Sequence, residues 1–283
     1  MKKLAILTFL YYLFFPTLLA QEIDNFFTEW ELDFKKESSQ YLFGNNVKLR
    51  DAPNFKSELI ELVTIDKKVK ILEKTEAKDI FKGVEHPWYK VQVGNKTGYI
   101  LGALIAHHKI STSENKVDFY FHINPEYKDK SFSIGIKAYK GKELLNAFDF
   151  NPIGHRFSFK VSGNRGIHEI SNIVMIDYIS EACGVEGGIT YLFWDNEQFI
   201  HVADLTQMGD GGVLHEHQEF IFPGDPEGRN NGKSEIIFKA EMGHEINEET
   251  QWYITNSQSR ILKWDSRKKK IIPEDFHSFP KEN

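Results

Sequence analysis

Polar and apolar residues alternate along most of this chain, and Gly or Pro separates the alternating segments. The alternation is clearest at residues 47–50, 88–93, 117–123, 132–139 and 157–161. Because successive side chains of a strand point to opposite faces, each segment is typical of a half-buried β-strand that ends in a turn. No segment from residue 107 onward has the period of about 3.6 residues that marks an amphipathic helix. The pattern therefore predicts an all-β protein.

Two motifs stand out within residues 41–106. The first is Val47-Lys-Leu-Arg-Asp-Ala-Pro53, and the second is Trp88-Tyr-Lys-Val-Gln-Val-Gly94 followed by Gly98-Tyr-Ile100. Together they resemble the bacterial SH3 domain, which opens with apolar-x-apolar-Arg-x-x-Pro and closes with Trp-Tyr-x-Val, a Gly turn and Gly-aromatic-Val. The resemblance implies a small SH3-like barrel over residues 41–106. It also implies a binding module, without naming the ligand.

Residues 73–87 are a charged insertion where the family has a short turn, and the simplest interpretation is a solvated hairpin extension. Aromatic faces beside a basic group are suited to holding an extended peptide or glycan. Arg50, Trp88 and Tyr99 are therefore the candidate ligand-binding residues. The competing interpretation is that the two aromatic side chains fill or rim the barrel.

Beyond the barrel, residues 107–180 are expected to form a β-sheet domain in which four strands share one sheet with one buried face. These strands are predicted at residues 117–123, 132–139, 144–150 and 157–161. Residues 181–283 continue as hairpins, so the second part of the chain is expected to be a sandwich or a propeller-like array. Phe193-Trp-Asp195 and Lys263-Trp-Asp265 are each followed by a turn and two apolar residues, which suggests a repeated hairpin or blade unit.

The chain begins with Lys2 and Lys3, followed by an apolar run that ends at Ala20. This is the layout of a secretory signal peptide over residues 1–20. A membrane anchor is the alternative, but Pro16 interrupts the run and leaves it short of the roughly 20 apolar residues that a span requires. We expect an exported protein, periplasmic or secreted, that keeps no transmembrane anchor after cleavage.

Residues 21–40 are expected to form a linker or a short helix. Four aromatic residues in this segment fit one face of such a helix: Phe26, Phe27, Trp30 and Phe34.

The chain has 35 basic and 41 acidic residues, a formal net charge of −6. Nucleic acid is an unsuitable partner for such a chain, because phosphate binding depends on a clustered basic surface. The densest basic run, residues 267–270, is interpreted as an exposed hairpin tip. The expected partners are instead a peptide, peptidoglycan or an envelope protein, and the oligomeric state is left open.

Cys183 is the only cysteine, so the chain forms no internal disulfide, and no cysteine at the cleavage site can carry a lipid. Glu181-Ala-Cys-Gly-Val-Glu186 lacks the helix start that activates a nucleophilic cysteine. A buried, structural cysteine at the end of a strand is expected here.

A divergent zinc-dependent cell-wall hydrolase is the main alternative, because His215-Glu-His217 places two imidazoles on one face of a strand. His201 and Asp204 are the residues that could complete such a site. The preceding His-x-x-x-Asp motif of lysostaphin-like peptidases is missing, since His201-Val-Ala-Asp204 is one residue too short. A structural component of an envelope complex is a third possibility.

Calcium is the other cation to consider, because oxygen ligands crowd two Gly-rich loops. These ligands are Asp204, Asp210, Asp225, Glu227, Asn230 and Asn231. Their spacing does not follow an EF-hand, and turns are rich in such residues for conformational reasons alone. No nucleophile elbow, phosphate loop or dinucleotide motif is present. We therefore expect a non-enzymatic binding protein without catalytic residues, bound metal or cofactor.

Overall fold

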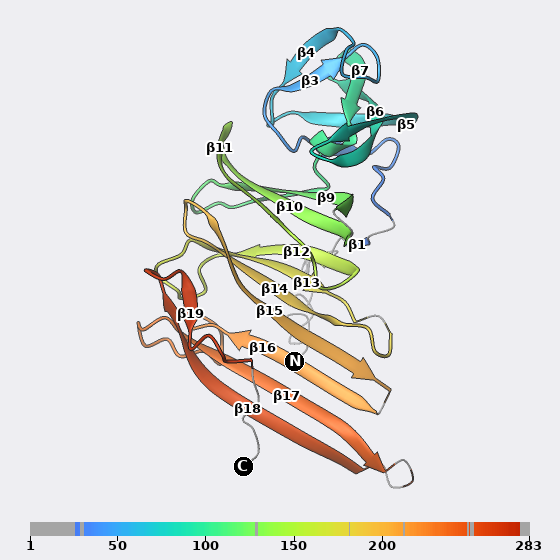
Figure 1. The fold of residues 1–283 in the computed structure, drawn as a ribbon. Helices are drawn as coiled ribbons and strands as arrows, with labels where there is room; N and C mark the ends of the chain where they lie inside the picture. Colours follow the sequence, from blue (N-terminus) through green and yellow to red (C-terminus); the bar gives the residue numbers. More distant parts are fainter. Residues whose placement is uncertain are drawn as a thin grey trace, which may run out of the picture.

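The computed structural model describes residues 26–28, 31–127, 130–180, 182–211, 213–247, 249 and 252–277. The predicted signal peptide and Trp30 lie outside these residues. Nineteen strands and one short 3-10 helix make up the regular structure of the described part, so the all-β prediction is confirmed. The strands form three antiparallel sheets that follow one another along the molecule (Figure 1). In the described residues, no helix is both long and apolar enough to span a membrane.

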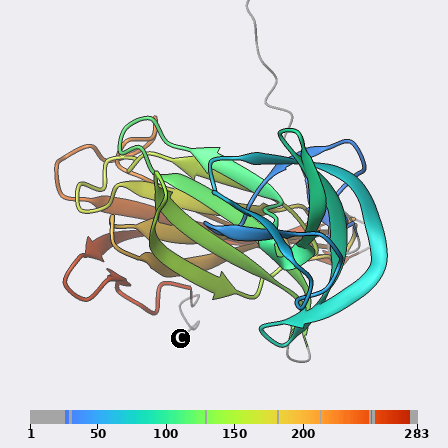
Figure 2. The same ribbon diagram turned by 90° about the horizontal axis from the view of Figure 1, so that it is seen from above.

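The first sheet is a curled half-barrel of six strands, which we call the module. Its strands are β2 (Ser39–Tyr41), β3 (Val47–Arg50), β4 (Leu59–Val63), β5 (Lys68–Phe81), β6 (Val84–Val93) and β7 (Lys96–Leu101). They are ordered β2-β5-β6-β7-β3-β4, and they curl round on themselves above the other sheets (Figure 2). As the alternation predicts, Val47, Leu49 and Val91 point into the module core while Lys48 is exposed. The charged insertion extends the β5–β6 hairpin, as expected.

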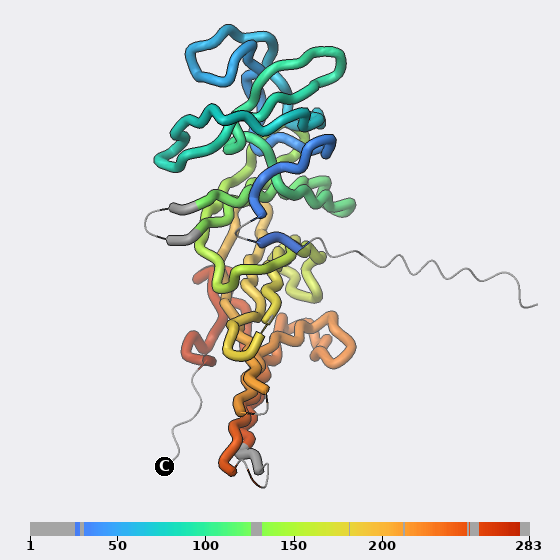
Figure 3. Tube along the Cα trace, turned by 90° about the vertical axis from the view of Figure 1, so that its right-hand side faces the viewer, coloured from blue at the N-terminus to red at the C-terminus, as the bar shows by residue number. Residues whose placement is uncertain are grey.

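The second sheet has four strands in the order β11-β10-β9-β8. They are β8 (His108–Ser111), β9 (Asp118–Tyr127), β10 (Lys130–Lys140) and β11 (Glu143–Phe150). The short helix η1 (Gly102–Leu104) and the residues that follow it lead from the module into β8. Figure 3 shows from the side how this sheet lies between the module and the third sheet.

The third sheet has nine strands in the order β1-β12-β13-β14-β15-β16-β17-β18-β19. They are β1 (Phe27–Thr28), β12 (Arg156–Ser162), β13 (Asn172–Tyr178), β14 (Gly187–Trp194), β15 (Phe199–Asp210), β16 (Leu214–Ile221), β17 (Glu235–Asn247), β18 (Trp252–Asp265) and β19 (Lys270–Ile272). One aromatic core joins this sheet to the four-stranded sheet, with Phe119 and Phe121 on one side and Phe157 and Trp194 on the other. The second part of the chain is therefore a sandwich, the first of the two predicted arrangements.

Two predictions about the four-stranded sheet are wrong. Residues 157–161 pair with β13 in the nine-stranded sheet, not with β11. Asn151-Pro-Ile-Gly154 lies outside any strand and takes the chain from one layer of the sandwich to the other. The sheet also has more than one buried face, because Phe119, Tyr120, Phe121 and His122 of β9 are all buried. Alternation fixes which side chains share a face, but it does not show what covers each face.

For residues 21–40, predicted as a linker or a short helix, the described part contains no helix: two short strand segments are joined by irregular chain with a turn at Lys36 and Glu37. Phe27 pairs with Phe157 of β12, and its ring packs 5.2 Å from the ring of Phe159. Ser39–Tyr41 pairs with β5. Both partners are distant in sequence, so tertiary pairing overrides the helical spacing of the aromatic residues.

Cys183 is exposed, so the prediction of a buried cysteine is also wrong. It lies in a turn between β13 and β14 and is not on either strand.

The two Trp-Asp segments each turn a hairpin in the same way. The side-chain oxygen of Asp195 accepts hydrogen bonds from two following backbone N–H groups, and Asp265 does the same. The turns are neighbours, because Lys269 Nζ lies 2.7 Å from Asp195 Oδ2. Arg267 and Lys268 are exposed at the hairpin tip, as expected for the basic run. The two segments are hairpins of one continuous sheet and not separate blades.

Gly98 shows how closely the module strands approach one another. A Cβ atom at this position would lie 2.6 Å from the Arg50 carbonyl oxygen and 2.8 Å from Leu49 Cγ. We expect Gly98→Ala to lower the free energy of unfolding by about 1–3 kcal/mol, because a backbone atom and a core side chain cannot both move aside to make room for the added methyl group. Gly44→Ala is the matched control, since its Cβ would have no neighbour closer than 3.8 Å. Urea denaturation followed by circular dichroism measures both, and equal midpoints for the two variants would contradict this account.

Candidate functional site

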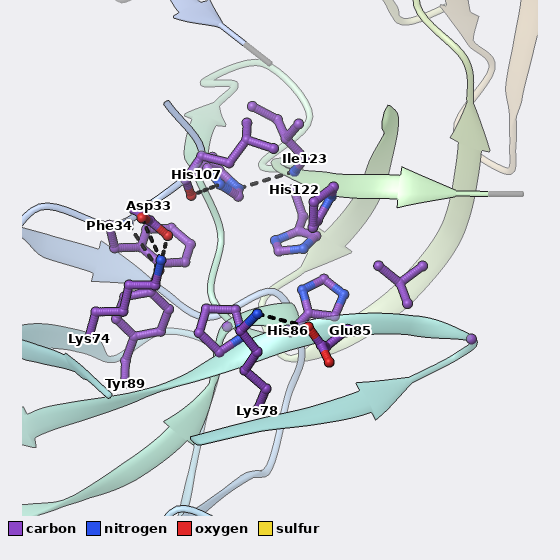
Figure 4. Close-up of a pocket in the computed structure, with 16 residues that line it drawn as sticks. Asp33, Phe34, Lys74, Lys78, Glu85, His86, Tyr89, His107, His122 and Ile123 are labelled. Atoms are coloured by element: carbon purple, nitrogen blue, oxygen red, sulfur yellow. Dashed lines mark hydrogen bonds and ion pairs between the residues drawn. The ribbon is translucent and has the colours of Figure 1, made fainter. Parts of the chain in front are cut away.

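A cavity of about 690 Å³ lies where the module meets β9, and we call it the junction cavity (Figure 4). Four parts of the chain line it: the segment before β2, the β5–β6 hairpin, the connection from η1 to β8, and β9. The lining residues are Leu32, Asp33, Phe34, Lys74, Lys78, Gly83, Val84, Glu85, His86, Pro87, Tyr89, Gly102, His107, His122, Ile123 and Pro125. The cavity therefore belongs neither to the module alone nor to the sheet alone.

Two ion pairs carry the charges that line the cavity. Lys74 Nζ lies 2.6 Å from Asp33 Oδ2, and Lys78 Nζ lies 2.9 Å from Glu85 Oε1. The hydrogen bond to Glu85 raises the pKa of Lys78. All four side chains are largely exposed, so these pairs contribute little to stability and their charges remain accessible to a ligand.

Tyr89 fixes the segment before β2 against the module. Its hydroxyl donates to Asp33 Oδ1 at 3.0 Å and accepts from the Phe34 backbone N–H at 3.4 Å. The Phe34 ring packs on the Tyr89 ring edge to face. Burial raises the pKa of Tyr89, so this hydroxyl stays protonated and keeps its role as a donor. The alternation of β6, which turns Tyr89 inward, therefore also positions a wall of the cavity.

Three histidines from different parts of the chain gather at the cavity, and we call them the histidine cluster: His86 of β6, His107 before β8, and His122 of β9. The ring centroids are 4.9 Å apart for His107 and His122, and 5.7 Å apart for His86 and His122. Burial lowers the pKa of His86 and of His107 to about 4, and the pKa of His122 well below its ordinary value. All three imidazoles are therefore neutral at pH 7.

The hydrogen bonds around these rings assign their tautomers. His107 Nε2 is 3.1 Å from the Leu32 carbonyl oxygen, and its Nδ1 is 3.1 Å from the Ile123 backbone nitrogen. His107 therefore donates through Nε2 and accepts through Nδ1. His122 Nδ1 donates to the Ile105 carbonyl at 2.8 Å, which leaves Nε2 unprotonated; this nitrogen is buried, and the described residues give it no hydrogen-bond partner. The cluster thus holds one unsatisfied acceptor within the wall of the cavity.

None of the three residues predicted from the sequence lines this cavity. Trp88 is only 1% exposed, and its indole Nε1 donates to Asp79 Oδ2 at 2.9 Å. It packs with Leu101 and Ala103, and the Phe55 ring lies against it at 5.4 Å.

Arg50 and Tyr99 are brought together, and Tyr99 packs against the cluster that contains Trp88. They are cross-strand partners on β3 and β7, and both are partly exposed. Arg50 Nη1 donates to the Ser57 carbonyl at 2.6 Å and so holds the loop that follows β3. Ligand binding by Arg50, Trp88 and Tyr99 stays a prediction.

The proposed zinc ligands do not come together. His217 pairs with Gln207 on β15, six positions along that strand from His201, which corresponds to about 20 Å. His201 instead lies 3.0 Å from Asp204, whose Oδ1 also accepts from Thr190. Within the described ranges, no group of three or more His, Cys, Asp or Glu side chains is arranged to hold a metal ion.

The calcium candidates are likewise engaged elsewhere. Asp225 forms a two-pronged ion pair with Arg165, and Glu227 pairs with Lys239. Asn231 donates to Glu235. These contacts hold loops against the nine-stranded sheet, so the oxygen atoms do not converge on one centre.

The histidine cluster is the part of the site that sequence reasoning missed. Alternation gave no signal for His86, because it has the opposite strand phase to Tyr89 and Val91, which point into the module core. His107 and His122 gave no signal either. Their meeting with His86 depends on how the module docks on β9.

Comparison with known protein families identifies the family to which the module belongs. Residues 45–106 match the bacterial SH3 domain family, so the predicted resemblance is confirmed for this segment. Searches of curated proteins and of solved structures gave no match. The module is therefore a bacterial SH3 domain, and the class it defines is that of binding modules.

Trp88 provides a test between a structural and a ligand-contacting role. Trp88→Phe removes the hydrogen bond to Asp79 and leaves a void beside Leu101. We expect the free energy of unfolding to fall by about 1–3 kcal/mol, measured by urea denaturation. Tyr99→Phe, at a partly exposed position, is the control and should change it by less than about 0.5 kcal/mol. A Trp88→Phe protein of unchanged stability would contradict the structural role.

Proposed function

We propose that this protein is an exported, non-enzymatic binding protein whose bacterial SH3 module binds a peptide or a peptide-bearing cell-wall fragment in the junction cavity. The observation that carries the proposal is the position of this cavity, between a module of a binding family and a second domain. The basic and apolar start of the chain supports export to the periplasm or beyond.

The chemistry of the cavity favours a peptide. Phe34, Pro87 and Ile123 supply apolar wall, which suits small side chains of a ligand. The Lys and carboxylate pairs can exchange partners with the charged groups of a peptide.

Calorimetric titration with soluble peptidoglycan fragments tests the wall-fragment form of this proposal. We expect one fragment to bind per chain, and Lys74→Met/Lys78→Met to weaken binding of a carboxylate-bearing fragment at least about tenfold. Lys56→Met/Lys67→Met is the matched control, because it removes two exposed lysines of the module outside the cavity. It should leave the affinity unchanged.

Three further variants separate the rival sites in the same titration. Arg50→Ala and Tyr99→Ala should have little effect on the affinity if the ligand occupies the junction cavity. A large loss of affinity would place the binding site on the β3–β7 face instead. His215→Ala/His217→Ala should also be neutral. If no fragment releases or absorbs heat on titration, cell-wall fragments are excluded as the ligand.

A further inference from the structure

The module is attached to the rest of the molecule by two chain crossings and one packed seam. The crossings are the segment before β2 and the connection from η1 to β8. The histidine cluster occupies one part of the seam. Aromatic residues occupy the other part, where Tyr41 and Phe43 pack with Tyr120 and Tyr139. The Phe43 ring also stacks on His122, with the ring centroids 5.2 Å apart, and so joins the two parts.

Protonation of the histidine cluster would remove contacts that hold the seam together. His107 accepts the Ile123 N–H through Nδ1, and an imidazolium has no lone pair with which to do so. His122 would gain an N–H at Nε2, where the described part of the chain offers no acceptor. His86, 3% exposed, would be charged in a buried position.

Among the described residues, the two carboxylates that line the cavity are already paired with lysines. The charge of Asp33 raises the pKa of His107, but burial outweighs this effect. Asp33, from the segment before β2, is engaged by Lys74 of β5 and by the Tyr89 hydroxyl. Glu85, beside His86 on β6, is engaged by Lys78 of β5.

On the sheet side of the cluster, the facing charge is Lys137 of β10, which donates to the Phe43 carbonyl at 2.7 Å. Its positive charge lowers the pKa of His122 further, as do the neighbouring imidazoles. Lys82 and Asp149 act on Lys137 with opposite signs. Protonation therefore places up to three like charges, with rings about 5–6 Å apart, next to a fourth cation.

We infer that this seam is an acid-sensitive hinge: protonation of His86, His107 and His122 releases the module from β9 while the module core and the sandwich core stay folded. No histidine is among the buried residues of either core. Each core still contacts an imidazole: the Phe34 ring lies 4.6 Å from the His107 ring, and His108, whose pKa burial lowers, packs on Phe121 and Phe159. Because the cluster lines the cavity assigned above to the ligand, the inference deepens that proposed function. Acid would open the site and release its ligand.

The direction of the pH dependence follows from the lowered pKa values. The closed seam binds fewer protons than the open one, so acid favours opening. His86 and His107 titrate at about 4 in the closed state and at their ordinary value of about 6.5 when exposed. Between these values, each imidazole raises the ratio of open to closed molecules by up to about tenfold for every unit by which the pH falls.

The test measures the distance between module and sheet with no ligand present, so its outcome is independent of whether any wall fragment binds. Spin labels at Lys56→Cys and Ser113→Cys, in a Cys183→Ser background, report this distance by pulsed electron resonance. We expect one narrow distribution at pH 7.5 and a broader, longer one at pH 4.5. Far-UV circular dichroism should stay unchanged, and global loss of β signal at pH 4.5 would overturn the hinge.

The His86→Gln/His107→Gln/His122→Gln variant should keep the narrow distribution at both pH values. His215→Gln/His217→Gln, which removes two histidines outside the seam, should open like the unmodified protein. Opening that persists in the triple variant would overturn the proposal.

A second measurement needs no histidine variant and so does not depend on the triple variant folding. The hydrogen-exchange protection of the Ile123 amide should fall at pH 4.5, while that of Val91 and Val174 in the two cores is retained. Unchanged protection at Ile123 would overturn the proposal.

Discussion

Burial of β9 on both faces is the constraint on which the arrangement of this protein depends. Phe119 and Phe121 point into the core shared with the nine-stranded sheet, while Tyr120 and His122 point toward the module. Because a strand alternates its side chains strictly, a shift of one residue would exchange the two sets. It would place His122 in the aromatic core and a Phe ring in the seam. The register of β9 therefore holds the sandwich together and also presents a polar group to the junction cavity.

The N-terminal segment is the second element that the site requires. The short pairing of β1 with β12 holds this segment to the nine-stranded sheet, and the pairing of β2 with β5 holds it to the module. Between these two points, Asp33 and Phe34 are held against Tyr89 at the cavity. A chain that crosses the seam in this way can close the cavity without a covalent link, and it gives the module a limited path of movement.

The same seam combines packing that is insensitive to pH with packing that is sensitive to it. The Tyr41, Tyr120 and Tyr139 contacts involve no imidazole, whereas Phe43 packs both on this aromatic cluster and on His122. The histidine cluster holds only while its imidazoles are neutral. A binding site built at such a boundary is rigid when closed, because both domains contribute walls, and it can be opened without unfolding either domain.

The period-two alternation is a local property, because a few consecutive residues specify a strand and its two faces. It was enough to predict the all-β class and the inward row of Val47, Leu49 and Val91, and the motifs at residues 41–106 were enough to predict the SH3 module. What each strand face packs against depends instead on contacts between segments far apart in the sequence. The prediction of a strand at residues 157–161 was correct, but the prediction of the sheet to which it belongs was wrong. Phe27 lies in a strand because it pairs with a strand that is far away in the sequence. His107 and His122 belong to the site for the same reason: burial and proximity, which lower their pKa values, arise from docking of surfaces that no short stretch of sequence encodes.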